Sequence, residues 1–284
     1  MIRLVLAALL AITAAWPQTQ APVFRSTTRA RMVDVAVFDG DRVVTGLRAE
    51  DFELRDNGVR QAITDIDLKV LPLDLRLVFD ISGSISEADL ARYLHAMRQV
   101  AATLRPTDQC EIVTFDARIA DAASRQSAPI SINLQRGPTD GTTFFDAVSL
   151  AMVTVPSLDR RQVTIVLSDA RDNASFLDEA SLLEAARRTD AVVYTVLPGT
   201  RASNRAVSVA RLESLAMLTG GRLVETHERA VGRAVITALD EFRQSYVLFY
   251  TPTGVPLEGW HALEVTVRER GGYRVRARAG YFGR

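Results

Sequence analysis

The chain has 284 residues, of which 48% are hydrophobic and 24% are charged, so it can bury a sizeable core and is not expected to be disordered. Lysine plus arginine and aspartate plus glutamate each number 34, so no net charge marks nucleic acid or an anionic membrane as the partner. The only cysteine, Cys110, excludes an internal disulfide, and its strand-like neighbours favour a buried thiol.

The first residues have the pattern of a secretory signal peptide. Arg3 precedes an apolar run from Leu4 to Ala15, which only Thr13 interrupts. This run is shorter than the roughly 20 residues that span a bilayer. We therefore predict a signal peptide over residues 1–21, no transmembrane segment after its removal, and a mature protein that is secreted, periplasmic or extracellular.

Residues 22–71 are predicted to form an N-terminal β segment. Apolar and polar residues alternate from Met32 to Phe38, and turn signals follow at Asp39-Gly40-Asp41 and Asp56-Asn57-Gly58. Asn-Gly is the strongest short-range signal for a β-hairpin. The segment is too short to form a good core of its own.

A different pattern begins at Pro72. Residues Leu73–Phe79 form an almost continuous apolar run that ends at Asp80. Ser86 and Asp89 are then placed as a capping box at the start of an amphipathic helix. A buried strand followed by a helix is the opening of a βαβ unit.

The alternation of strands and helices continues to residue 243. The further predicted strands are Glu111–Phe115, Val163–Leu167 and Ala191–Leu197, and the further predicted helices are Phe144–Val155, Glu179–Arg188, Leu212–Leu218 and Ala230–Phe242. Apolar strands separated by amphipathic helices indicate a parallel sheet covered on both faces. We predict a doubly wound α/β domain over residues 72–243.

Residues 244–284 are again predicted to be β, with strands over Ser245–Tyr250, Leu263–Arg268 and Tyr273–Ala279. Because the ends of a chain often lie close together, this segment and the N-terminal β segment could pair into one small β unit. Five arginines fit a solvated strand face at least as well as a binding stripe: Arg268, Arg270, Arg274, Arg276 and Arg278.

Two strands of the predicted α/β domain end at an aspartate, Asp80 and Asp169. Ligands of open parallel sheets bind beyond the carboxyl ends of the strands, although aspartate is also a common turn former there. Asp80 is followed by Ser82 and Ser84, and Gly83 permits the curl that would direct all three oxygen side chains at one point. Oxygen ligands without histidine or thiolate favour Mg²⁺, with Mn²⁺ and Ca²⁺ as alternatives.

The order and spacing of these residues resemble the metal-ion-dependent adhesion site of von Willebrand factor A (VWA) domains. Asp80, Ser82 and Ser84 match the first element of that motif, Thr142 matches its threonine, and Asp169 matches its second aspartate. The resemblance implies a six-stranded, mostly parallel sheet. It also implies that these five residues hold a metal that bridges to an acidic residue of a partner.

The flanking segments resemble acidobacterial-type VWFA-related proteins, so this resemblance covers nearly the whole mature chain. It is carried by Asp51–Gly58 before the α/β domain and by Ser245–Pro252 and Val275–Tyr281 after it.

Some positions near the motif depart from its commonest form or leave two interpretations open. Asp140 and Ala170 stand where glycine is frequent in the family. Asp140 either adds negative charge beside the metal or serves as a loop or cap residue. Asp172 and Asn173 either orient the site from behind the ligands or form a polar turn before the next helix.

The sequence therefore predicts a secreted, metal-dependent protein-binding or adhesion module that captures an aspartate or glutamate of a protein partner. A structural or assembly module with an unused metal site is the alternative. A metal-dependent hydrolase or phosphotransferase has less support, and we expect no enzyme. A phosphotransferase would carry a second aspartate at Ser82, and neither His95 nor His261 is obviously aimed at a serine of the motif.

Overall fold

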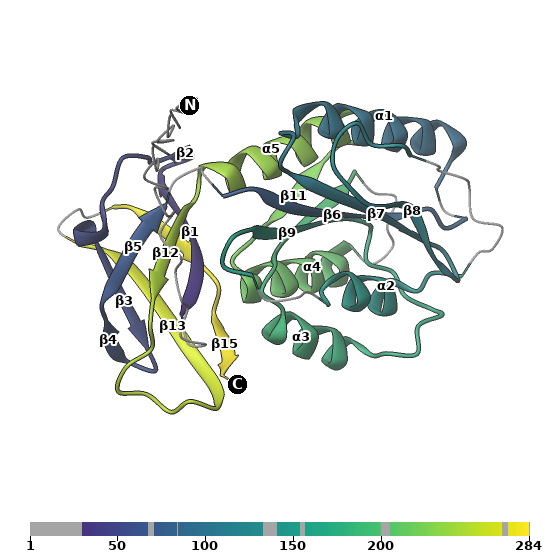
Figure 1. Cartoon of the computed structure of the whole chain (residues 1–284). Helices are drawn as coiled ribbons and strands as arrows, with labels where there is room; N and C mark the ends of the chain where they lie inside the picture. The colour runs from purple at the N-terminus through teal and green to yellow at the C-terminus, as the bar shows by residue number, and fades with distance from the viewer. Residues whose placement is uncertain are drawn as a thin grey trace, which may run out of the picture.

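The computed structural model describes residues 30–67, 71–83, 85–132, 141–153, 157–199, 205–268 and 272–283. Within them, an α/β domain and a β-sandwich lie side by side (Figure 1). The predicted signal peptide lies outside the described residues, as do Ser84 and Asp140 of the predicted site.

The α/β domain is built on a six-stranded sheet with the strand order β11-β10-β9-β6-β7-β8. The strands are β6 (Leu73–Asp80), β7 (Gln109–Phe115), β8 (Ile119–Gln126), β9 (Arg161–Leu167), β10 (Val192–Pro198) and β11 (Leu223–Thr226). Neighbouring strands are parallel except at the edge, where β8 is antiparallel to β7. The predicted doubly wound, mostly parallel sheet is confirmed, and the strand order reverses between β6 and β9.

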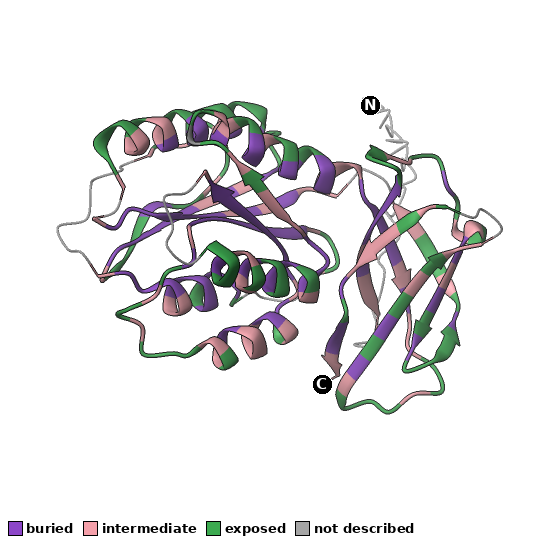
Figure 2. Ribbon diagram, turned by 180° about the vertical axis from the view of Figure 1, so that it is seen from behind, coloured by how far each residue is buried: buried purple, intermediate pink, exposed green. Residues whose placement is uncertain are grey.

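Helices cover both faces of this sheet, and their buried residues face it (Figure 2). Helices α1 (Glu87–Thr103) and α5 (Val231–Gln244) cover one face, and α2 (Phe144–Ala151), α3 (Glu179–Arg188) and α4 (Arg205–Thr219) cover the other. Ser86 caps α1 as predicted, because its hydroxyl accepts the Asp89 N–H at 3.1 Å. Of the described helices, none is long and apolar enough to cross a membrane.

The N- and C-terminal segments pair with each other into the two sheets of the sandwich. One sheet contains β1 (Arg31–Asp39), β2 (Arg42–Val43), β5 (Ile63–Asp67), β12 (Tyr246–Tyr250) and β14 (Arg274–Ala277). The other contains β3 (Phe52–Asp56), β4 (Val59–Gln61), β13 (Gly259–Val267) and β15 (Gly280–Gly283). Two short 3-10 helices, η1 (Ala49–Asp51) and η2 (Glu228–Ala230), complete the described elements. The Asn57-Gly58 signal is a hairpin turn between β3 and β4, and both residues have positive φ, 48° and 79°.

A buried polar network lies inside the sandwich. The carboxylate of Asp56 accepts hydrogen bonds from the hydroxyls of Tyr250 at 3.0 Å and Tyr281 at 2.8 Å. Nδ1 of His261 lies 2.7 Å from the same carboxylate, and the imidazole is 1% exposed. His261 is therefore part of the sandwich core.

One buried arginine joins the sandwich to the amino ends of the strands. Arg161, the first residue of β9, is 1% exposed, and its Nε lies 2.7 Å from the Asp34 carboxylate in β1. Its Nη2 also donates to the carbonyl of Phe242 at 2.8 Å and to the hydroxyl of Ser245 at 2.5 Å. The sandwich thus packs at the amino ends of the strands, which leaves their carboxyl ends at the opposite edge.

Two of the C-terminal arginines complete this interface, so the prediction of a solvated arginine face is wrong at these positions. Arg276 pairs with Glu241 of α5 and donates to the carbonyl of Gly220 at 3.1 Å. Arg278 is 9% exposed and donates to the carbonyl of Thr189 at 2.6 Å. Alternation along one strand cannot show that another domain covers its outer face.

Candidate metal centre at the carboxyl edge of the sheet

Asp80 and Asp169 lie at the point where the strand order reverses. Asp80 is the last residue of β6, and Asp169 lies two residues beyond the end of β9. The two strands are parallel neighbours, and Phe79 is paired with Leu167. Open α/β sheets bind their ligands at such a switch point, so the sequence places both aspartates where a ligand is expected.

The carboxyl group of Asp80 is buried, with 2% of the residue exposed. Its Oδ1 accepts the Ser82 N–H at 3.0 Å, and its Oδ2 accepts the Ser168 hydroxyl at 2.9 Å. Burial raises the pKa of Asp80, the nearby charge of Asp169 raises it further, and the hydrogen bonds from Ser82 and Ser168 oppose the change. No ion pair between described residues includes Asp80. Within the described part of the chain, no cation therefore offsets the desolvation of this carboxylate.

The loop after Asp80 curls as the sequence predicts. The N–H of Ile81 still bonds to the carbonyl of Phe115 at 2.9 Å, which continues the pairing of β6 with β7. The N–H of Ile85 then bonds to the carbonyl of Ser82 at 2.9 Å, which closes a tight turn toward α1. Ser82 is 2% exposed, and its side chain is hydrogen-bonded to the Asp80 carboxyl group. The position of Ser84 is outside the described residues.

Thr142 is fixed to the loop that follows Asp169. Its N–H donates to the side-chain oxygen of Asn173 at 2.7 Å, and its carbonyl accepts the N–H groups of Asn173 at 3.1 Å and Ala174 at 3.2 Å. Thr142 is 6% exposed. Asn173 therefore positions Thr142. Of the two interpretations of Asn173, this contact favours orientation of the site over a simple polar turn.

The residue after Thr142 is fixed to the loop that follows β7. The N–H and the hydroxyl of Thr143 both donate to the carbonyl of Asp116, at 2.8 and 2.9 Å. Asp116 directly follows Phe115, which is paired with Asp80 across the sheet. Thr142 therefore lies at the same edge of the sheet as Asp80 and Asp169.

Asp172 caps the helix that Thr142 precedes. Thr143, the N-cap residue of α2, makes no side-chain capping hydrogen bond. Instead, Oδ2 of Asp172 accepts the Phe145 N–H at 2.9 Å and the Ser175 hydroxyl at 2.5 Å. Asp172 thus fixes the start of α2 from the neighbouring loop, and so acts on the position of Thr142 through the backbone.

Asp169 has an internal cationic neighbour. Its Oδ2 lies 3.1 Å from Nε of Arg171, and its Oδ1 accepts the Arg171 N–H at 3.1 Å. The Arg171 side chain is 50% exposed. Exposed ion pairs contribute about 0–1 kcal/mol, so Arg171 can leave Asp169 at little cost.

Ala170 occupies a backbone conformation that favours glycine. Its φ is +57°, in the left-handed region, and the residue is completely buried. An L-residue pays about 1–2 kcal/mol there. The frequent glycine of the family at this position thus has a physical reason, and this chain keeps the turn with alanine.

Ser168 was not identified from the sequence as a site residue. Its hydroxyl donates to Asp80 and accepts the N–H of Ala170 at 2.9 Å, which joins the end of β6 to the turn after β9. The sequence feature that could have identified Ser168 is its position at the end of an apolar strand, next to Asp169. A serine there is also common in turns, so the residue alone does not predict the bridge.

The donor chemistry at this edge fits a hard divalent cation. Among the described residues, no three or more of histidine, cysteine, aspartate and glutamate are grouped to hold a metal. The predicted ligand set contains only two carboxylates, and hydroxyl groups supply its other donors. Such an all-oxygen set suits Mg²⁺, Mn²⁺ or Ca²⁺ better than Zn²⁺.

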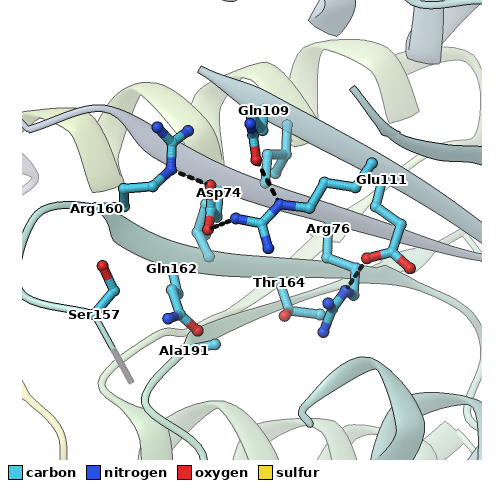
Figure 3. A pocket seen from close by; sticks show the side chains of 12 residues that line it. Asp74, Arg76, Gln109, Glu111, Ser157, Arg160, Gln162, Thr164 and Ala191 are labelled. Carbon is cyan, nitrogen blue, oxygen red and sulfur yellow. Dashed lines mark hydrogen bonds and ion pairs between the residues drawn. The ribbon is translucent and has the colours of Figure 1, made fainter. Parts of the chain in front are cut away.

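A cavity of about 380 Å³ lies at the amino ends of the strands, on the face that carries α2 (Figure 3). Its acidic residues are paired with arginines. Asp74 pairs with Arg160 at 2.5 Å and also with Arg125, and Glu111 pairs with Arg76 at 2.7 Å. The acidic side chains that line this cavity are therefore neutralised by arginines. Asp80 differs from them, because no described arginine or lysine pairs with it.

Known proteins resemble this chain in structure but not in sequence. No protein-family model matches the chain, and neither does any curated protein. A similar solved structure is VWA2, the ArnB paralog of Sulfolobus acidocaldarius, with a TM-score of 0.51, 11% identity and coverage of 88% of this chain and 75% of that one. A von Willebrand factor type A protein from Catenulispora acidiphila gives a TM-score of 0.50 at 9% identity, with 91% and 75% covered.

Proximal thread matrix protein 1 from the mussel byssus has a TM-score of 0.50 at 15% identity. The match covers 66% of this chain and 51% of that protein, so this chain spans about half of its length. At these identities the likeness concerns the fold alone. Together with the strand order and the helices on both faces of the sheet, it shows that the α/β domain of this chain has a VWA-like fold.

Proposed function

We propose that this protein is a secreted binding module in which a divalent cation, Mg²⁺ or else Mn²⁺ or Ca²⁺, captures an acidic side chain of a protein partner at the carboxyl edge of the VWA sheet. One observation carries the proposal. The buried carboxyl group of Asp80 accepts hydrogen bonds from neutral donors, lies near the charge of Asp169, and forms no ion pair with any described residue. A bound cation would supply the missing positive charge.

The proposed ligands have two roles. Asp80 and Asp169 supply charge, and three hydroxyl groups supply neutral oxygen donors, those of Ser82, Ser84 and Thr142. Neutral donors leave more of the charge of the cation for an incoming carboxylate than a cluster of acids would. Ser168, Asp172 and Asn173 would hold these ligands in place through the hydrogen bonds described above.

A structural or assembly module with an unused metal site is the second candidate. It is supported by Arg171, whose guanidinium already contacts one oxygen of Asp169. We propose no catalytic role. His261 is buried in the sandwich, and His95 lies exposed on α1, so neither supports a nucleophile at the edge of the VWA sheet.

Capture of a partner from the native secretome, with Mg²⁺ or with EDTA, tests the proposal. Binding should be lost in EDTA and in Asp80→Ala and Asp169→Ala, with unchanged circular dichroism. Ser82→Ala, Ser84→Ala and Thr142→Ala should weaken it less, because water can replace a neutral ligand. Asp74→Asn, on the same strand but at the opposite end, is the matched control and should bind normally. A partner whose affinity ignores chelation would refute the proposal.

A further inference from the structure

The loop that follows Asp169 holds an aromatic ring in solvent. Phe176 has a relative exposure of 101%, and its neighbour Leu177 is 42% exposed. Burying a side chain of this size stabilises a protein, and Phe176 does not contribute in this way within the chain itself. Single exposed apolar residues are common on protein surfaces, so exposure alone assigns no role. Two further observations indicate a role for Phe176: hydrogen bonds hold the backbone that carries the ring, and the ring lies in the loop next to Thr142.

The backbone of Phe176 is held by α2. The carboxylate of Asp146, in the first turn of that helix, accepts the N–H of Phe176 at its Oδ2 and the N–H of Leu177 at its Oδ1, both at 2.9 Å. In return, the hydroxyl of Ser175 accepts the N–H of Asp146 at 3.1 Å. These reciprocal bonds fix the part of the loop from which the ring projects.

The same loop is held at its other end by the residues around Thr142. Asn173 bonds to Thr142 in both directions, and Asp172 caps α2. Asp146 lies in the first turn of α2, and Thr142 directly precedes Thr143, the N-cap residue of that helix. The ring of Phe176 is therefore displayed by a stiff support close to a proposed metal ligand.

A ring with stiff support is well suited to binding. Ordering a mobile side chain opposes association, whereas a side chain on a fixed backbone loses less conformational freedom. Met217, which is 65% exposed, lies instead in the last turn of α4, away from the carboxyl edge of the sheet. Large aromatic residues also dominate the energetics of many protein interfaces.

We propose that Phe176 is the apolar anchor of the partner-binding surface, and that it inserts into an apolar pocket next to the partner's metal-binding carboxylate. The proposal rests on the proposed function, because it describes the partner of the same site. Asp146 and Asp172, which hold the backbone that carries the ring, give this loop negative charge that disfavours an anionic membrane as the occupant. The partner is thus a folded or cyclic polypeptide with an acidic residue beside an apolar cleft.

A displayed library of disulfide-cyclised peptides, each with one fixed aspartate among random positions, tests this on the full mature chain in Mg²⁺. Selected peptides should share apolar residues at a constant spacing from the aspartate. In fluorescence polarisation their affinity should fall roughly 10- to 100-fold for Phe176→Ala, the loss expected when the burial of one ring is removed. Met217→Ala, the matched control for an exposed apolar residue, should change it less than twofold.

The outcomes separate this inference from the proposed function. If EDTA and Asp80→Ala abolish binding and Phe176→Ala does not change it, the anchor is wrong and the metal mechanism survives. If Phe176→Ala abolishes binding that ignores EDTA and Asp80→Ala, the anchor stands and the metal mechanism fails. A library that yields no binder, or a Phe176-dependent affinity for phosphatidylcholine–phosphatidylglycerol vesicles, overturns the assignment of a polypeptide partner. Phe176→Ala removes no buried side chain, so thermal unfolding should match wild type.

Discussion

Asp74 and Asp80 lie on the same face of the same strand, near its opposite ends, and their surroundings differ in charge. Asp74 pairs with Arg160 and Arg125 at the amino end of the sheet (Figure 3). Asp80, at the carboxyl end, accepts hydrogen bonds from hydroxyl and amide groups and lies near a second carboxylate. The fold thus neutralises acids where the sandwich and the strands meet, whereas no described residue supplies a cation to Asp80, where a ligand is expected.

The largest expected effect comes from breaking a buried pair at the amino end. Arg161→Ala leaves Asp34 buried without its cation and removes the hydrogen bonds to Phe242 and Ser245. Removal of one partner of a buried ion pair costs about 3–5 kcal/mol of unfolding free energy. Urea unfolding followed by circular dichroism measures it. A loss below about 1 kcal/mol, the size expected for an exposed pair, would contradict this interpretation of the interface.

At the carboxyl end of the sheet, removing a charged group should raise the unfolding free energy instead of lowering it. Folding raises the pKa of Asp80 above its ordinary value of 3.8, so the folded protein keeps this proton to higher pH than the unfolded chain. The associated stability is fully present below the unfolded pKa and is lost as pH rises through the folded pKa.

In EDTA, Asp80→Asn should therefore become increasingly more stable than wild type as pH rises from roughly 4 to 7, by about 1.4 kcal/mol for each unit by which folding raises the pKa. Urea unfolding at a series of pH values measures this difference, and saturating Mg²⁺ should reduce it. A variant that is less stable than wild type throughout this range would show that the Asp80 carboxylate already has its counter-charge.

A smaller effect is expected from the residue that positions Thr142. Asn173→Ala removes the acceptor for the Thr142 N–H. Loss of a residue that orients a metal ligand typically weakens metal binding about 10- to 100-fold, and we expect the lower end because Ala174 still holds Thr142. Calorimetric Mg²⁺ titration measures it. Asp178→Ala, which removes the N-cap of α3 in the same stretch of chain, should leave the affinity unchanged.

The smallest effect is expected at the exposed part of the ion-pair network. Arg125 is 48% exposed, and Asp74 keeps Arg160 when Arg125 is removed. Arg125→Ala should therefore change the unfolding free energy by less than about 1 kcal/mol. A larger loss would mean that the network at the amino end acts as one cooperative unit.

Much of the fold follows from local sequence patterns, and the exceptions share a physical cause. The central strands β6, β9 and β10 are mostly apolar because helices cover both of their faces. The edge strands β8 and β11 were missed. Strand β8 has several exposed positions, and alanine is its main apolar residue. Strand β11 is only four residues long, so neither strand has the pattern of a buried strand.

The candidate site was predictable to a similar extent. The motif indicates Asp80, Ser82, Thr142 and Asp169, and the structure places these four at one edge of the sheet. The hydrogen bonds of Ser168 and Asn173 join residues that are far apart in the chain, and no local pattern encodes such partners. The metal, its partner and the closer resemblance to acidobacterial-type VWFA-related proteins remain predictions.

Isothermal titration of the protein with Mg²⁺ tests the central claim most directly. The account predicts saturable binding by wild type and by the Asp74→Asn control, and no binding by Asp80→Ala of the same fold. Identical, unresponsive titrations of wild type and Asp80→Ala would contradict it and favour a structural module. Equal binding by the two proteins would place the cation elsewhere.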